Sequence, residues 1–221
     1  MEAPVISCPR CPALPAGLAE AARLLAGRSS CRFGQPWAEA VEGRFRPGSV
    51  ALAWDGDQLG VWADLDDDDV FNEGSDSTQP LWALGDVFEM FLRPLPGERY
   101  VELHVTPENV QLRLAFPSEL FFWREAMFYG RKPWVWNHAL GEEAFGSEAS
   151  RRDGGWQVWA RIPWATLTGG TVPGVGEVWS GCFCRYDATR GETEPVLSTT
   201  GAHRRRMFHD QRGWNRIEFE G

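Results

Sequence analysis

The fold is decided by residues 85–109, which read GDVFEMFLRPLPGERYVELHVTPEN and alternate apolar with polar side chains in two arms. Successive side chains of a β-strand point to opposite faces, so this period of two predicts a strand in each arm. The intervening RPLPGER supplies the Pro and Gly of a turn, and the stretch therefore predicts a β-hairpin. One face of this hairpin is apolar enough for a core and consists of Phe88, Met90, Leu92, Val101, Leu103 and Val105.

The second face of the hairpin mixes rings with charged groups and consists of Val87, Glu89, Phe91, Tyr100, Glu102 and His104. A merely solvated face would be expected to carry Lys, Thr or Ser. Saccharide sites combine rings, on which the C–H surface of the sugar packs, with charged groups that bond to its hydroxyls. We therefore predict that this face lines a ligand cleft, with Arg185 as the counter-charge that keeps Glu89 ionised.

Other segments extend the period-two pattern beyond the hairpin. Strands are expected at 50–66, which turns at DGDQ, and at 109–116, 155–162, 178–187 and 214–219. Residues 17–27 carry the one helical pattern, which Gly27 ends. Many short strands with little helix predict an all-β protein, an antiparallel β-sandwich of jelly-roll or immunoglobulin type with a short N-terminal helix. We divide the chain into an N-terminal extension, residues 1–34, and a sandwich domain, residues 35–221.

The segment 117–150 follows neither period and is dense in Phe and Trp. Loops of this length in compact domains are usually functional or carry structure of their own. Two interpretations stay open: a lid or wall over one sheet, or a helical turn and an extra edge strand that close the core.

Charge and hydropathy exclude several classes of partner. The net charge of −9 and the pI near 5.0 argue against binding to nucleic acid or to an anionic membrane surface. No apolar run approaches the roughly 20 residues that span a bilayer. The N-terminal residues lack the pattern of a signal peptide, so we expect a cytoplasmic protein by default.

The chain has an odd number of cysteines, namely Cys8, Cys11, Cys31, Cys182 and Cys184. The spacing of Cys8 and Cys11 resembles that of zinc ligands, and Cys182 and Cys184 share one side of a strand. A four-thiolate zinc site is therefore an alternative to five free thiols. Reduced thiols are typical of a cytosolic protein.

Two tryptophans lie on the face of their strand that also carries a charged group. Trp62 shares its face with Asp64, and Trp159 shares its face with Arg161. Either these rings stack on a saccharide beside charged hydrogen-bonding groups, or they pack beneath the aromatic segment.

An acidic run concentrates hard oxygen ligands within thirteen residues, 64–76. Calcium binds six to eight such oxygens, and a cation would also relieve the repulsion within the run. We predict a structural calcium site formed by Asp64, Asp66, Asp68, Asn72 and Asp76. The alternative is a solvated acidic loop.

Five segments together resemble, in order and spacing, the carbohydrate-binding family 9-like domains, which are related to family 9 carbohydrate-binding modules and the DOMON-like superfamily. They are WDGDQLGVWADLDDDD, LGDVFEMFLRPLPGERYVELHVTPEN, DGGWQVWARIPW, VWSGCFCRYDATRG and PVLSTTGAHRRRMFHDQRGWNRIEFEG, and they cover residues 35–221. The resemblance implies a β-sandwich, often secreted with polysaccharide-degrading enzymes, that binds saccharide ends between aromatic rings and carries calcium.

The resemblance places Glu89 at the glutamate of the family's D-x-x-E motif and Arg185 at its arginine on the penultimate strand. The chain departs from the family at Trp159, where a glutamate is usual, and at Cys182, where an asparagine is common. The predicted ligand contacts are Trp62, Glu89, Phe91, Glu102, His104, Trp159, Arg161 and Arg185.

The leading hypothesis is a non-catalytic domain that binds a mono- or oligosaccharide and serves polysaccharide breakdown. One alternative is a glycosidase, in which Glu89 and Glu102 would be paired carboxylates roughly 5–10 Å apart. A second is a haem carrier that uses Met90 and His104, although these residues have opposite parity. A third is a structural domain whose exposed tryptophans form a protein interface.

Overall fold

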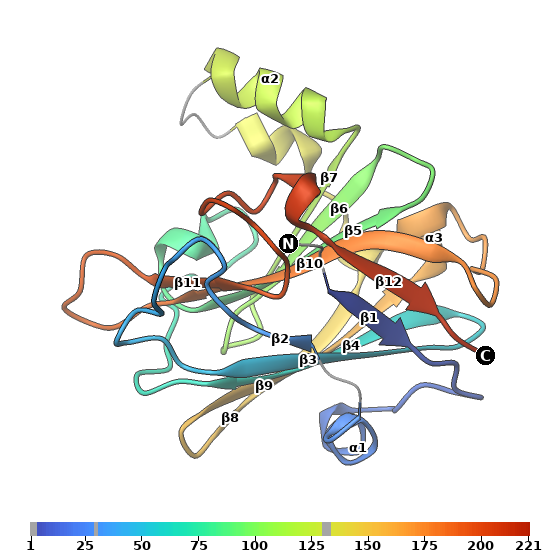
Figure 1. Ribbon diagram of the computed structural model, residues 1–221, viewed down its shortest axis with the longest axis horizontal. Coiled ribbons are helices and arrows are strands. Elements are labelled where there is room, and N and C mark those ends of the chain that lie inside the picture. The colour runs from blue at the N-terminus through green and yellow to red at the C-terminus, as the bar shows by residue number, and fades with distance from the viewer. Residues whose placement is uncertain (1–3, 29–30, 130–133) are drawn as a thin grey trace.

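The computed structural model describes residues 4–28, 31–129 and 134–221 and contains two stacked β-sheets (Figure 1). Within these ranges, seven strands form the first sheet: β1 (Val5–Cys8), β5 (Val87–Pro94), β6 (Tyr100–Val105), β7 (Gln111–Phe116), β10 (Val178–Asp187), β11 (Val196–Thr199) and β12 (Asn215–Phe219). Five form the second: β2 (Cys31–Arg32), β3 (Gly48–Trp54), β4 (Gln58–Asp66), β8 (Gly146–Arg152) and β9 (Gly155–Pro163).

The order of the strands places the hairpin β5–β6 inside the seven-stranded sheet. This sheet runs β1-β12-β10-β5-β6-β7, with β11 beside β10, and the other sheet runs β2-β3-β4-β9-β8. The named pairs are antiparallel except β1 with β12, which is parallel. The predicted antiparallel β-sandwich is confirmed.

The core lies between the two sheets and includes the apolar face of the hairpin. Across β5 and β6, Phe88 pairs with Val105 and Met90 pairs with Leu103. All four side chains are buried against residues of the opposite sheet such as Val61. The burial of each aliphatic or aromatic side chain stabilises the fold by roughly 1.5–3 kcal/mol.

Helices cover the outer faces of both sheets. In Figure 1, α2 (Glu119–Tyr129) lies above β5, β6 and β7, whereas α1 (Leu18–Leu25) lies below β3, β4 and β9. A shorter helix, α3 (Trp164–Thr168), follows β9. Four 3₁₀ turns complete the helical elements of the described ranges: η1 (Leu81–Ala83), η2 (Trp134–His138), η3 (Glu142–Ala144) and η4 (Gln211–Gly213). None of the described helices combines the length and the apolar character that a bilayer span requires.

The elements expected from the sequence are present, and further elements accompany them. The helix predicted at 17–27 is α1, and each predicted strand segment contains a strand. The strands β1, β2 and β11 and the helix α3 were not predicted. Both interpretations of 117–150 hold in part, because α2 and η2 cover one sheet while β8 is an edge strand of the other. Residues 130–133 of this segment lie outside the described residues.

Candidate functional site: a buried Glu–His cluster beside an open groove

The polar face of the hairpin lies on the outer face of the seven-stranded sheet, where it is buried. Glu89 is 3% exposed, Glu102 6% and His104 0%. Apolar side chains of α2, η2 and the 208–214 segment pack over this face, among them Phe122, Trp136, Phe208 and Trp214. The hairpin therefore has one apolar face in the core and a second face beneath a roof of aromatic residues.

Two carboxylates and two imidazoles meet beneath this roof, and we call Glu89, Glu102, His104 and His209 the Glu–His cluster. The Nε2 atom of His104 lies 2.8 Å from Glu102 Oε1 and 3.3 Å from Glu89 Oε1. His209 Nε2 lies 3.5 Å from Glu102 Oε2. The cluster forms because Glu89 is the cross-strand partner of His104, and Glu102 shares the face of His104 two residues along β6.

Burial and neighbouring charges shift the ionisation of the cluster. Burial raises the pKa of Glu89 to about 8. Burial opposes a charged His104, but Glu89 and Glu102 outweigh it and raise its pKa above the ordinary value. Burial lowers the pKa of His209 to about 4, so this imidazole is neutral at pH 7. At neutral pH the cluster therefore combines a protonated Glu89 with a neutral His209.

Trp82 separates the cluster from solvent. Its ring meets the ring of His104 edge-on at 5.8 Å between centroids, and the ring of Trp136 stacks with it at 6.4 Å. Phe122 stacks on His209 at 3.4 Å. The position of Trp82 therefore depends on the buried histidine and on Trp136.

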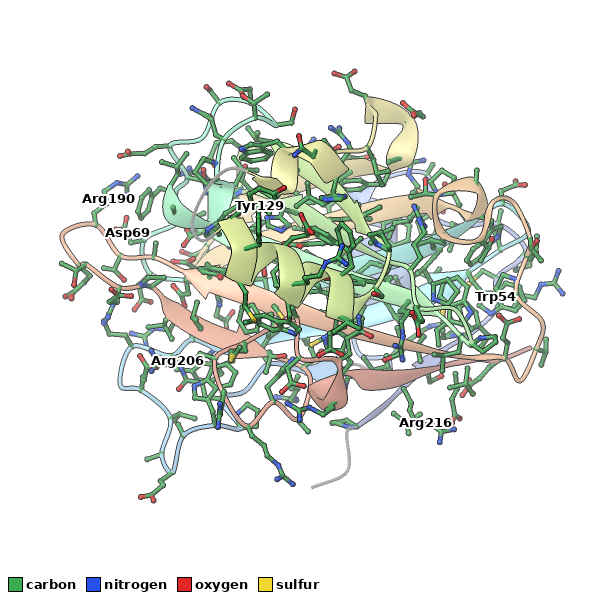
Figure 2. All side chains as sticks on the ribbon, turned by 90° about the horizontal axis from the view of Figure 1, so that it is seen from above. Trp54, Asp69, Tyr129, Arg190, Arg206 and Arg216 are labelled. Carbon is green, nitrogen blue, oxygen red and sulfur yellow. The ribbon has the colours of Figure 1, made fainter. Side chains whose placement is uncertain are left out.

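An open groove of about 900 Å³ lies on the outer side of Trp82. Its walls combine rings, charged groups and backbone, and include Phe71, Glu73, Trp82, Gly85, Tyr186, Arg190, Glu192, Glu194, Leu197 and Arg206. The guanidinium of Arg190 lies 4.1 Å from the centre of the Phe71 ring and pairs with Asp69. Figure 2 shows Arg190 beside Asp69 at the end of the molecule opposite Trp54, with Arg206 below them on the same side.

The eight predicted ligand contacts lie on two different sheets. Glu89, Phe91, Glu102 and His104 lie on the outer face of the seven-stranded sheet. Trp62 and Trp159 are paired across β4 and β9 on the outer face of the other sheet, buried beneath α1, and Arg161 follows Trp159 on the same side.

Arg185 does not balance Glu89. Its guanidinium lies 2.9 Å from Asp67 Oδ2 and 3.2 Å from Asp187 Oδ2, and it is fully buried. Its cross-strand partner on β5 is Phe88, a core residue, so the side chain of Arg185 leaves the sheet on the face opposite Glu89. The residue that pairs with Glu89 is His104, and not Arg185 as we expected.

The five predicted calcium ligands do not converge either. Arg152 pairs with Asp64 at 2.6 Å and also with Asp66, and Arg46 pairs with Asp68. The side chain of Asn72 donates to Leu81 O and Asp86 O. Asp76 accepts hydrogen bonds from Thr78 in a local turn. The ion pairs with arginine compete with a cation for these carboxylates.

Three other aspartates do converge, and we call Asp67, Asp86 and Asp187 the Asp cluster. One oxygen from each lies within 4.8 Å of the others. Burial and the neighbouring Asp67 raise the pKa of Asp86 to about 8. Burial raises the pKa of Asp187 to about 6 even though Arg185 opposes the shift. The Asp cluster therefore carries more negative charge than Arg185 balances.

The cysteines do not form the alternative four-thiolate site. Cys8 lies in the core between the sheets, and Cys11 lies beneath α1. Cys182 and Cys184 lie on the outer face of the seven-stranded sheet, with their sulfur atoms 3.6 Å apart. All five cysteines are free thiols.

The fold has solved counterparts. A family 9 carbohydrate-binding module of Caldicellulosiruptor kristjanssonii, in complex with cellotriose, is 14% identical over 98% of this chain and 94% of its own, with a TM-score of 0.66. The chain has the fold of a family 9 carbohydrate-binding module. The family 9 module in complex with glucose, from the same organism, has a TM-score of 0.63 at 13% identity, with 98% of this chain and 96% of its own covered.

A third similar structure comes from Bacteroides uniformis ATCC 8492 and bears the name "putative carbohydrate-binding protein". It is 17% identical, covers 99% of this chain and 100% of its own, and has a TM-score of 0.70. No protein-family model matches the chain. No curated protein matches it either. The resemblance expected from the five segments is therefore confirmed at the level of the fold.

Sequence reasoning missed the residues that line the open groove. Tyr186 lies in the predicted strand 178–187 and Trp82 lies between two predicted strands, and neither is among the predicted contacts. The signal that would have found Trp82 is its place in QPLWALGD, directly before the strand that carries Glu89. Tyr186 follows Arg185 on β10. Its side chain points to the outer face of the sheet, whereas the side chain of Arg185 points to the inner face.

Proposed function

We propose that this protein is a non-catalytic domain that binds a mono- or oligosaccharide in the groove beside Trp82. The observation that carries the proposal is the groove itself, which places the Trp82 and Tyr186 rings among Arg and Glu side chains. Rings of this kind pack on the C–H face of a sugar, while charged groups bond to its hydroxyls. The groove is also large enough for a small ligand.

The neighbours in fold suggest which saccharides to try first. Two of them are family 9 modules in complex with cellotriose and with glucose. We therefore propose glucose and short β-glucans as the ligand class, in the context of polysaccharide breakdown. The sheet-face residues Glu89, Glu102 and His104 would support the ligand from beneath Trp82.

Replacement of Trp82 by alanine is expected to weaken saccharide binding by about ten- to a hundredfold, which corresponds to the roughly 1.5–3 kcal/mol of an apolar contact. Isothermal titration calorimetry with cellotriose, preceded by a glycan array, measures this change. Phe128→Ala is the matched control, because Phe128 is an aromatic residue on α2 that is 79% exposed and lies outside the groove. Equal affinities of both variants and the wild-type protein would show that the saccharide does not bind beside Trp82.

A glycosidase is the weaker alternative. The nearest oxygens of Glu89 and Glu102 lie within 4.8 Å of each other, and His104 contacts both carboxylates. Neither carboxylate lines the groove. A retaining or inverting mechanism needs both carboxyl groups at the scissile bond, one on each side. The geometry therefore favours binding over hydrolysis.

We also propose that a structural calcium ion binds at the Asp cluster rather than at the five ligands predicted within the acidic run. Hard carboxylate oxygens suit calcium, and a dication would offset the burial and the repulsion from Asp67 that raise the pKa of Asp86 and Asp187. Calcium is expected to raise the melting temperature of the wild-type protein, because a ligand of the native state stabilises it. Asp86→Asn should abolish the increase, whereas Asp76→Asn should keep it. An equal response of both variants would place the ion elsewhere.

A further inference from the structure

The Glu–His cluster gathers several potential metal ligands in one buried place. It brings two carboxylates and the imidazole of His104 together on the outer face of the seven-stranded sheet, with one donor atom from each within 4.8 Å of the others. His209 completes the group from the segment that precedes η4. These donors come from β5, β6 and the C-terminal segment, so the tertiary fold, rather than a local motif, assembles them.

The distances in the cluster match those between ligands of one metal ion. Four-coordinate zinc binds nitrogen and oxygen at about 2.0–2.1 Å, which places neighbouring tetrahedral donors about 3.4 Å apart. His104 Nε2 lies 3.3 Å from Glu89 Oε1 and 2.8 Å from Glu102 Oε1, and His209 Nε2 lies 3.5 Å from Glu102 Oε2. Glu89, Glu102 and His104 therefore lie at separations close to the edges of a coordination tetrahedron, and His209, which contacts the other oxygen of Glu102, would be the fourth donor after a side-chain shift.

The surroundings of the cluster hold His209 in place. The hydroxyl of Tyr100 lies 2.8 Å from Nδ1 of His209, so the remaining ring nitrogen, Nε2, faces the carboxylate of Glu102. Phe122 stacks on the same ring at 3.4 Å. A hydrogen bond to the second nitrogen of a histidine is the usual way in which a protein orients a metal ligand.

We propose that Glu89, Glu102, His104 and His209 form a binding site for a divalent transition-metal ion of the zinc class. Two carboxylates balance the charge of a dication, which makes the buried assembly neutral. Imidazole nitrogen among the donors selects zinc and its neighbours over calcium or magnesium. The site is distinct from the Asp cluster, whose donors are all oxygen.

A bound ion would also affect the proposed saccharide groove, because Trp82, which lines the groove, packs on His104. The metal site does not depend on the saccharide proposal, because its ligands are chosen on their mutual geometry alone. Loss of metal binding would leave the Trp82→Ala comparison unchanged as a test of the groove. Conversely, a protein that binds no saccharide could still bind the ion.

The test uses the full chain, refolded in the presence of zinc so that the buried cluster is accessible, and then dialysed. We expect one zinc ion per chain by elemental analysis, with only nitrogen and oxygen neighbours, including imidazole, in the X-ray absorption spectrum at the zinc edge. His104→Gln and Glu89→Gln, which nearly preserve side-chain size, should each lose at least about 100-fold in zinc affinity. The double variant Cys182→Ser and Cys184→Ser is the control and should keep the ion.

Three results would overturn the proposal. One is a wild-type protein that retains no zinc after refolding. Another is zinc retention by both cluster variants with wild-type affinity. The third is a sulfur neighbour in the absorption spectrum, which would place the ion at Cys182 and Cys184. The spectrum of the wild-type protein decides the ligand type even where the variants do not fold.

Discussion

Replacement of Arg185 by methionine is expected to lower the free energy of unfolding by about 3–5 kcal/mol. Arg185 is fully buried and its Nη2 atom contacts both Asp67 and Asp187. Methionine fills part of the volume but leaves these carboxylates without their counter-charge in a site of low polarity. Urea denaturation in calcium-free buffer measures the loss.

The matched control for Arg185 is Arg190→Met. Arg190 also pairs with an aspartate, Asp69, but its side chain is 58% exposed. Exposed ion pairs contribute at most about 1 kcal/mol, because water screens them. Similar losses in the two variants would mean that the buried pair is no stronger than a surface pair, and would contradict the argument.

Replacement of Trp159 by alanine is expected to cost about 3–5 kcal/mol of stability, the order found for large-to-small changes in a core. Trp159 is fully buried between the five-stranded sheet and α1, and its Nε1–H donates to Pro15 O at 3.2 Å. Its ring also packs so closely on Gly60 that a Cβ atom there would lie 2.2 Å from it. Loss of the ring therefore leaves a cavity and removes a contact that holds α1 on the sheet.

The same variant separates a structural role for Trp159 from a ligand contact. Calorimetry at a temperature where the variant is folded should give the wild-type saccharide affinity, because Trp159 and the groove lie on different sheets. Phe128→Ala again serves as control and should change neither property. A variant with unchanged stability and lost saccharide binding would support the original expectation that Trp159 stacks on a sugar.

The regular strands could be predicted from the sequence because their pattern is local. In β5 and β6, alternation alone identified which side chains enter the core. The position of the strand β8 could not be predicted from its pattern, because GSEASRR lies at a sheet edge and carries almost no apolar side chain. The position of the helix α2 could not be predicted from its pattern, because its aromatic residues do not gather on one side. Neither the helical period nor the period of two appears in ELFFWREAMFY.

The candidate site was only partly predictable. The sequence identified Glu89, Glu102 and His104 as residues of one face, and the structure brings these three together. It also assigned Arg185 to Glu89, although Arg185 belongs with Asp67. Parity relates side chains within one strand, whereas the pairing of distant strands and loops decides which charges meet.

The sequence by itself determined the fold class, the two faces of the hairpin and the residues that fill the core. These follow from side-chain alternation, which each strand carries independently of the rest of the chain. Only the tertiary structure decided that the polar face is covered, that Trp82 divides a buried cluster from an open groove, and that His209 joins that cluster. The physical reason is that cover, charge pairing and cavities depend on segments far apart in the chain, and no local period records where those segments pack.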